Sequence, residues 1–257
     1  MKNKRPLILV TNDDGITAPG IRALIEAVRD LGDLVVIAPD KPQSGMGHAI
    51  TLNSTLRIHA IQDVEGITEY SCSGTPADCV KIAIGRFLPR KPDLCVSGIN
   101  HGSNSSINVI YSGTMSAAVE GCIEGIPSVG FSLCDHSLEA DFSNAKRVVQ
   151  KVSKKILENG LPQGTCLNVN IPKVPAEELK GIKVCRQANA IWEETFDERT
   201  DPSGRKYYWL TGYFKNLDDG KDTDEWALSQ GYVSVVPVGI DFTAHRFINE
   251  LQSWNLK

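Results

Sequence analysis

The chain has 257 residues, of which 41% are hydrophobic and 23% are charged, and its formal net charge is −4. This composition is typical of a globular protein with a sizeable core. The small negative charge gives no general basic field, so we expect binding neither to duplex nucleic acid nor to a membrane. The seven scattered cysteines contain no CxxC pair, which indicates reduced thiols in a cytoplasmic protein.

The N-terminal part predicts a strand, a helix and a second strand. Residues 7–10 form a continuous apolar run, as a strand buried on both faces does. Apolar residues then recur at helical spacing over 21–31, with Pro19 suited to the first turn and Gly32 to the position after the last turn. Residues 34–38 predict another buried strand. This order is typical of a parallel βαβ unit.

The same alternation continues towards the C-terminus. Strands are predicted at 67–72, 93–98, 128–133 and 166–171, the last closing the sheet, and helices at 76–87, 112–123 and 141–158. The pattern predicts an α/β fold with a Rossmann-like, doubly wound, mostly parallel sheet.

The C-terminal part has a different texture. Three Trp and three Tyr fall within residues 189–227, which favours β-hairpins or arms over βαβ units. A strand is predicted at 231–237 and a terminal helix at 242–251. We therefore expect a Rossmann-like core at 1–188, followed by a β-rich C-terminal extension at 189–257 with a hairpin arm and a terminal helix.

Polar, glycine-spaced loops follow several of the predicted strands. They cover residues 12–15, 39–47, 73–76 and 97–104, and residues 112–114 open the next helix. Because ligands bind outside the carboxyl ends of the strands in a doubly wound sheet, we expect these loops to converge on one site.

Two adjacent carboxylates, Asp13 and Asp14, follow the first strand. Neighbouring residues in a strand point to opposite faces, so both carboxylates can meet only where the strand has turned into its loop, as Gly15 permits. In a partly buried pocket the pair would repel unless a divalent cation lay between them. For an isolated pair, Asp14 as a helix cap and Asp13 in solvent would be favoured. Because the other polar loops are expected at the same edge of the sheet, a shared metal site is favoured here instead.

Further candidate ligands come from the neighbouring loops. The Ser44 hydroxyl and the Asn100 amide complete an all-oxygen set that favours Mg²⁺ or Mn²⁺, with Co²⁺ or Ca²⁺ as alternatives. Ser112, Gly113 and Thr114 at a helix start form a candidate phosphate site, although this tripeptide alone is a weak signal. The chain lacks GxGxxG, Walker A and GxSxG motifs, which disfavours dinucleotide, P-loop and esterase chemistry.

These loops, in this order, resemble the SurE family of stationary-phase survival proteins, which are 5′/3′-nucleotidases. The matching stretches are ILVTNDDGITAPGI (8–21), APDKPQSGMGHAITL (38–52), CSGTPADCV (72–80), PDLCVSGINHGSN (92–104), VIYSGTMSAAVEG (109–121) and TDEWALSQGYVSVVPVGIDFT (223–243). The resemblance implies a metal site made of two Asp, one Ser and one Asn, which fall on Asp13, Asp14, Ser44 and Asn100. It also implies phosphate contacts around Asn104 and residues 112–114, which makes 1–188 a metal- and phosphate-binding core. Family members form dimers or tetramers with exchanged C-terminal arms, so the resemblance implies that the extension at 189–257 serves oligomerisation, with 189–227 as the candidate arm.

The chain departs from the family pattern at two places. Gln43 stands where many relatives have Arg, and residues 106–108 lack an acidic residue that many relatives carry. Neither change touches a candidate ligand, but both bear on substrate preference.

The expected activity is hydrolysis of nucleoside 5′-monophosphates, with 3′-monophosphates as further candidates, by one divalent cation per subunit. Asp13 or Asp14 would act on the attacking water, or Asp13 would attack directly. The alternatives are a broad-specificity acid phosphatase or exopolyphosphatase, a haloacid-dehalogenase-like phosphatase, and a non-enzymatic nucleotide-sensing module. The dehalogenase-like chemistry needs Asp-x-Asp, which the adjacent pair does not supply.

Overall fold

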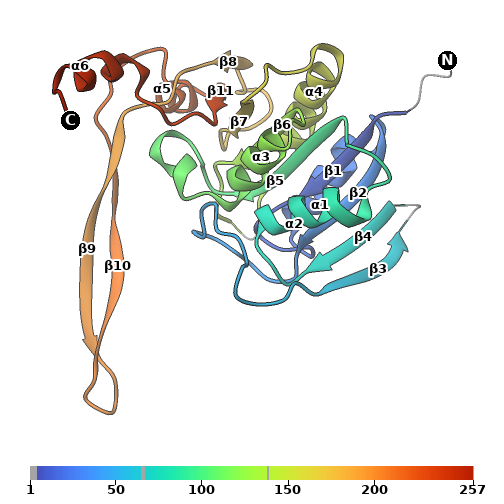
Figure 1. Cartoon of the computed structure of the whole chain (residues 1–257), viewed down its shortest axis with the longest axis horizontal. Coiled ribbons are helices and arrows are strands. Elements are labelled where there is room, and N and C mark those ends of the chain that lie inside the picture. The colour runs from blue at the N-terminus through green and yellow to red at the C-terminus, as the bar shows by residue number, and fades with distance from the viewer. Residues whose placement is uncertain (1–4, 65–66, 138, 257) are drawn as a thin grey trace.

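The computed structural model describes residues 5–64, 67–137 and 139–256. Its centre is a nine-stranded sheet covered by helices on both faces, and a two-stranded hairpin projects from this body (Figure 1). The strands are β1 (Leu7–Thr11), β2 (Asp33–Pro39), β3 (Ile58–Val64), β4 (Ile67–Cys72), β5 (Leu94–His101), β6 (Ser128–Leu133), β7 (Thr165–Ile171), β8 (Ile182–Val184), β9 (Ala190–Thr200), β10 (Lys206–Asn216) and β11 (Val233–Gly239). The α-helices are α1 (Pro19–Val28), α2 (Pro76–Ile82), α3 (Gly113–Ile123), α4 (Ser143–Asn159), α5 (Asp224–Ser229) and α6 (Ile248–Ser253).

The strand order of the main sheet is β3-β4-β2-β1-β5-β6-β7-β11-β8. Strand β1 pairs in parallel with β2 on one side and with β5 on the other. The chain therefore builds the sheet outward from β1 through β2 to β4, then returns to β5 and continues the other way. This reversal makes the β1–β5 boundary the switch point at which ligands bind in doubly wound folds. The predicted fold class is confirmed.

The core explains why β1 is apolar throughout. Ile8 and Val10 pack in one cluster with residues of α1 and α4, whereas Leu9 packs in a second cluster with residues of α2. Because successive side chains point to opposite faces, a strand covered on both faces needs apolar residues at every position.

The first helix ends earlier than the sequence predicts. Its apolar stripe suggests an end near Leu31, but α1 ends at Val28. Gly32 is not its cap, which is Arg29. A Cβ atom at Gly32 would lie 2.4 Å from the carbonyl oxygen of Pro6, so a close backbone approach requires this glycine.

The sheet also extends beyond the strand predicted to close it. Strand β11 pairs antiparallel with β7, and β8 then pairs in parallel with β11. The short edge strand β8 and the antiparallel edge strand β3 carry too weak a pattern to be predicted. Hence β11, which the sequence assigned to the extension, shares the hydrogen bonds of the main sheet. The division at residue 188 stays a prediction.

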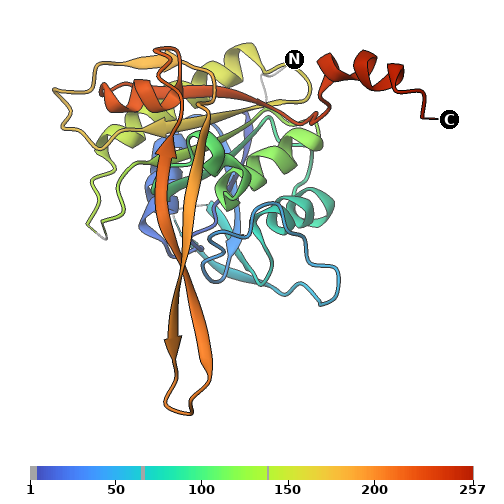
Figure 2. The same cartoon turned by 90° about the vertical axis from the view of Figure 1, so that its left-hand side faces the viewer.

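Strands β9 and β10 form the predicted hairpin, paired from Ala190 opposite Asn216 to Thr200 opposite Lys206. Figure 2 shows this arm extending well away from the sheet and its helices. Within the described residues, every helix is too short or too polar to traverse a bilayer. All seven cysteines are free, and six of them are buried.

Candidate active site at the switch point of the sheet

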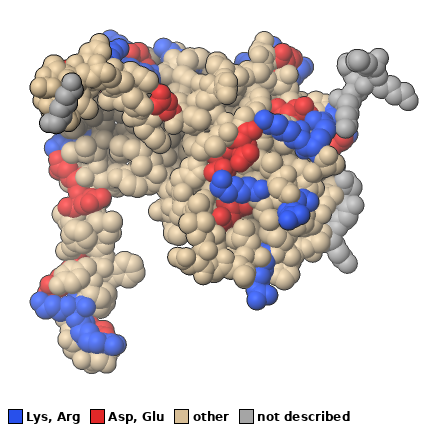
Figure 3. Space-filling model, in the orientation of Figure 1, with Lys and Arg blue, Asp and Glu red and all other residues tan. Residues whose placement is uncertain are grey.

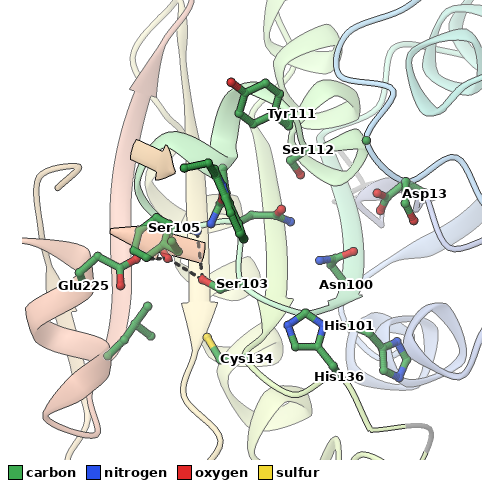
Figure 4. A pocket seen from close by; sticks show the side chains of 17 residues that line it. Asp13, Asn100, His101, Ser103, Ser105, Tyr111, Ser112, Cys134, His136 and Glu225 are labelled. Carbon is green, nitrogen blue, oxygen red and sulfur yellow. Dashed lines mark hydrogen bonds between the residues drawn. The ribbon is translucent and has the colours of Figure 1, made fainter. Parts of the chain in front are cut away.

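A pocket of about 540 Å³ opens at the carboxyl ends of β1 and β5. Predicted site residues from four different segments line it (Figure 4). They are Asp13, Ser44, Asn100, Asn104 and Ser112. The structure therefore brings most of the predicted site together. Asp14, Gly113 and Thr114 do not line the pocket, but each of them contacts a residue that does.

Asp13 is the most deeply buried of the candidate metal ligands, with 4% of its surface exposed. Burial raises the pKa of its carboxyl to about 6; the Thr114 hydrogen bond lowers that pKa, and the charge of Asp14 raises it. The Thr114 hydroxyl donates to Oδ1 of Asp13 over 2.5 Å. Thr114 thus turns towards Asp13 and does not face the pocket. A positive charge beside Asp13 would offset the cost of burying it.

The first residue of α3, Gly113, packs directly against Asp13. A Cβ atom at Gly113 would lie 2.6 Å from Cβ of Asp13, closer than atoms of two side chains can approach. The absence of a side chain here lets the positive end of the helix approach the carboxylate. Gly113 is therefore needed for the position of Asp13.

Asp14 lies on the side of the site formed by β5. The backbone N–H of His101 donates to Oδ2 of Asp14 over 3.4 Å, and Nδ1 of the same histidine is 3.5 Å from that oxygen. Gly15 has a φ of +101°, which confirms the expected turn after the strand. Helix α1 has Ala18 at its N-cap and no side-chain cap, so the alternative of Asp14 as a helix cap is wrong.

The two other candidate ligands are held by backbone contacts. The N–H of Gln43 donates to the carbonyl of Asp13 over 2.8 Å, which ties the loop carrying Ser44 to the first strand. The side-chain NH₂ of Asn100 donates to the carbonyl of Gly102 over 2.9 Å. Since that bond uses the amide nitrogen, the amide oxygen of Asn100 is left to accept or to ligate.

The candidate phosphate-binding residues are held equally firmly. The Asn104 backbone N–H donates to Oδ1 of Asn170, and its side-chain NH₂ donates to the hydroxyl of Ser132, both over 2.8 Å. The Ser112 hydroxyl caps α3 by accepting from the N–H of Met115 over 3.0 Å. Its own proton remains available to a ligand in the pocket.

The pocket has a second half that the sequence did not predict. Tyr111, Trp192 and Phe214 form an aromatic side, and Trp192 is anchored by donating to Oδ1 of Asn108 over 2.8 Å. Trp192 and Phe214 are direct cross-strand partners at the base of the hairpin. Glu225 of α5 lines the pocket as well. The aromatic residues of 189–227 predict an arm, but they do not predict that the start of the hairpin lines this pocket.

The donor set suits a hard divalent cation. Two carboxylates, a hydroxyl and an amide oxygen match the preference of Mg²⁺ or Mn²⁺ for oxygen ligands. In the described part of the chain, no three His, Cys, Asp or Glu side chains gather into a metal-binding group. A cation at Asp13 and Asp14 would therefore draw its other protein ligands from Ser44 and Asn100.

Comparison with known proteins gives one consistent result. The family model described as survival protein SurE matches residues 8–194. A 5′-nucleotidase SurE of Christiangramia forsetii is 67% identical, and the alignment covers 100% of this chain and 99% of the relative. The 5′-nucleotidase SurE of Flavobacterium johnsoniae is 64% identical, and the alignment again covers 100% of this chain and 99% of the relative. The crystal structure of the SurE protein from Aquifex aeolicus superposes with a TM-score of 0.84 at 40% identity and covers 97% of this chain and 100% of its own. The chain belongs to the SurE family.

Proposed function

We infer that this protein is a 5′-nucleotidase, which hydrolyses nucleoside monophosphates to nucleoside and phosphate. Relatives that align with the whole chain at 67% and 64% identity carry that name. The observation that carries the inference is the pocket at the β1–β5 switch point, which combines a carboxylate pair, an amide and a capped helix start. A nucleotide-sensing module would have no use for a buried carboxylate beside the phosphate.

For the chemistry, we propose that Asp13, Asp14, Ser44 and Asn100 hold one divalent cation per subunit, with Mg²⁺ or Mn²⁺ preferred. When bound, the cation supplies Lewis-acid polarisation of the phosphate and a more acidic water. Thr114 holds the Asp13 carboxylate in one orientation through its 2.5 Å hydrogen bond.

The phosphate itself would be held by groups at the start of α3 and in the loop after β5. Asn104 and the Ser112 hydroxyl line the pocket, and the free N–H groups at the start of α3 lie behind Ser112. Asp13 either orients the attacking water or attacks the phosphorus itself. Both roles require its carboxylate at the pocket wall.

The Asp13→Asn variant tests the site most directly. A change at a residue that only orients a metal ligand typically costs 10- to 100-fold in metal affinity or activity, so losing a ligand should cost at least ~100-fold. We expect kcat/KM for AMP and for p-nitrophenyl phosphate to fall by at least that factor, and EDTA to abolish wild-type turnover. Full activity of Asp13→Asn in saturating Mg²⁺ and Mn²⁺ would remove Asp13 from the site.

A substrate panel separates the nucleotidase from its broader alternatives. The panel contains 5′- and 3′-nucleotides, p-nitrophenyl phosphate and polyphosphate, each assayed with Mg²⁺, Mn²⁺, Co²⁺ and Ca²⁺. A nucleotidase favours nucleotides in kcat/KM, whereas a general acid phosphatase or an exopolyphosphatase does not.

We further propose that the hairpin serves to assemble a homodimer or homotetramer. An isolated two-stranded hairpin is marginal in water, yet β9 and β10 carry large apolar side chains in the open. Phe196 is 67% and Leu210 is 61% exposed, and the two lie directly opposite each other on one face. A second copy of the chain would bury that face.

We also propose a cytoplasmic location, which the free cysteines support.

A further inference from the structure

The pocket reaches beyond the phosphate-binding residues to a second polar group. The hydroxyls of Ser103 and Ser105 lie 2.5 Å apart, and the Ser105 hydroxyl donates to Oε1 of Glu225. Figure 4 shows this chain of hydrogen bonds at the end of the pocket remote from Asp13. All three residues line the pocket, and the phosphate chemistry proposed above uses none of them.

Glu225 offers this end of the pocket a carboxylate oxygen that can accept hydrogen bonds. Burial raises the pKa of its carboxyl, the Ser105 bond lowers it, and the neighbouring Asp224 raises it. Within the described residues, Glu225 has no cationic partner, and Oε2 accepts no hydrogen bond. A half-buried carboxylate with a free oxygen is ready to accept hydrogen bonds from a ligand.

The position of Glu225 is fixed by its neighbour. The two carboxylate oxygens of Asp224 accept from the backbone N–H groups of Ser106 and Ala188, over 2.8 and 2.9 Å. The bond from Ser106 joins the start of α5 to the loop that follows β5, and the bond from Ala188 joins it to the segment before β9. The acceptor therefore belongs to the same rigid wall as Asn104.

The kinds of side chain that line the pocket match the groups of a nucleotide. Asn104, a candidate phosphate contact, is followed in the chain by Ser105, which bonds to Glu225. The aromatic side with Trp192 and Phe214 lines the same pocket. In a nucleoside 5′-monophosphate the phosphate is followed by the ribose diol and then by the flat base. A carboxylate accepts from two hydroxyls, and aromatic rings suit a base.

We propose that Glu225 is a specificity-determining residue that accepts hydrogen bonds from the 2′- and 3′-hydroxyls of a ribonucleoside 5′-monophosphate. Ser105 orients the carboxylate through Oε1 and leaves Oε2 to the sugar. This assignment rests on the proposed nucleotidase function and adds to it a preference for ribose over sugars without the diol. Trp192 and Phe214 provide the contact for the base.

The test compares substrates that differ only in the diol. We would measure kcat/KM for AMP, 2′,3′-dideoxy-AMP and p-nitrophenyl phosphate with the wild type, with Glu225→Gln and with a control, Glu158→Gln. Glu158 lies on α4 and pairs with Lys155 at the surface, outside the pocket. Glutamine keeps the shape of Glu225 but replaces an acceptor by a donor.

The wild type should favour AMP over dideoxy-AMP. Glu225→Gln should lower kcat/KM for AMP by about 10- to 100-fold, the usual cost of losing hydrogen bonds to a charged group. Dideoxy-AMP, p-nitrophenyl phosphate and the control variant should be nearly unaffected. Ser105→Ala should raise KM for AMP with a smaller change in kcat, because it frees the carboxylate without removing it.

Different failures have different meanings. Equal losses on AMP and dideoxy-AMP, or no loss on either, overturn the ribose assignment while nucleotidase activity stands. A loss that depends on the base and not on the sugar assigns Glu225 to the base instead. If the wild type hydrolyses p-nitrophenyl phosphate but no nucleotide, the proposed function itself fails.

Discussion

The switch-point pocket and the β9–β10 arm are stabilised in contrasting ways. At the pocket, Asp13 is almost fully buried and hydrogen-bonded to Thr114 of a neighbouring helix. Along the arm, Phe196, Leu210 and Trp209 are more than half exposed. Figure 3 shows the arm as a narrow projection whose Lys and Arg side chains gather near its tip. The pocket is held by the core of its own chain, whereas the arm leaves large apolar side chains open to solvent.

After the loss expected for Asp13→Asn, the next largest effect comes from crowding the pocket. Gly113→Ala places a methyl group 2.6 Å from Cβ of Asp13, so that the carboxylate must move. A displacement of about 1 Å at a reacting group can cost ~100-fold, and we expect kcat/KM for AMP to fall 10- to 100-fold. Alanine is the better helix former by about 1 kcal/mol, so the melting temperature should change little.

The matched control for this variant is Gly85→Ala. Gly85 is also helical, but a Cβ atom there would have nothing within 4 Å. Activity should be unchanged. If both alanine variants keep wild-type activity, Gly113 does not set the position of Asp13.

Much of the pocket could be predicted because local sequence decides it. The apolar run of β1 must be buried on both faces, and the turn at Gly15 then delivers Asp13 to the sheet edge. The start of α2 is equally local, since Thr75 and Asp78 form a capping box within four residues. In these cases, residues close in the chain carry the whole signal.

The rest depends on contacts between residues far apart in the chain. Trp192 reaches the pocket because Asn108 accepts from its indole, and Glu225 does so because Asp224 ties α5 to the loop after β5. Neither pairing leaves a periodic trace in the sequence. The edge strands β3 and β8 were missed for the same reason, since a short strand is defined by its partner.

A smaller effect, on assembly and not on turnover, is expected from the arm. The double variant Phe196→Lys/Leu210→Glu puts opposite charges at a directly opposed pair, so the hairpin itself stays paired. It also puts charges on a face that we propose a second copy buries. We expect the assembly to dissociate at protein concentrations at least ~10-fold higher than for the wild type, a loss of about 1.4 kcal/mol. Analytical ultracentrifugation measures this shift.

The other face of the arm provides the control. Thr195 and Thr211 are also directly opposed, and their hydroxyls lie 2.8 Å apart. Thr195→Lys/Thr211→Glu should leave assembly intact. Dissociation of this variant alone would assign the interface to the opposite face of the hairpin.

The smallest effect is expected at Glu120, a buried carboxylate that supports the pocket without lining it. His48 Nε2 lies 2.8 Å from its Oε2, and Lys81 donates to its Oε1 over 2.7 Å. His48 follows Ser44 in the same loop, so this carboxylate joins that loop to α3. Glu120→Gln weakens both bonds, and we expect a loss of about 1–2 kcal/mol in the free energy of unfolding at pH 7.5.

The pH dependence identifies the source of that stability. Burial raises the pKa of Glu120, whereas the hydrogen bonds from His48 and Lys81 lower it. The lowering effects together are larger, so the folded-state pKa lies below the usual value. A lowered folded-state pKa stabilises the protein fully above the unfolded value of about 4.3, and the stabilisation is lost as the pH falls through the folded-state pKa. Urea unfolding should therefore separate wild type from Glu120→Gln at pH 7.5, and the two should come together as the pH falls below about 4.3 and through the lowered folded-state pKa. A gap that persists at low pH would mean that packing, and not the charge, joins the loop of Ser44 to α3.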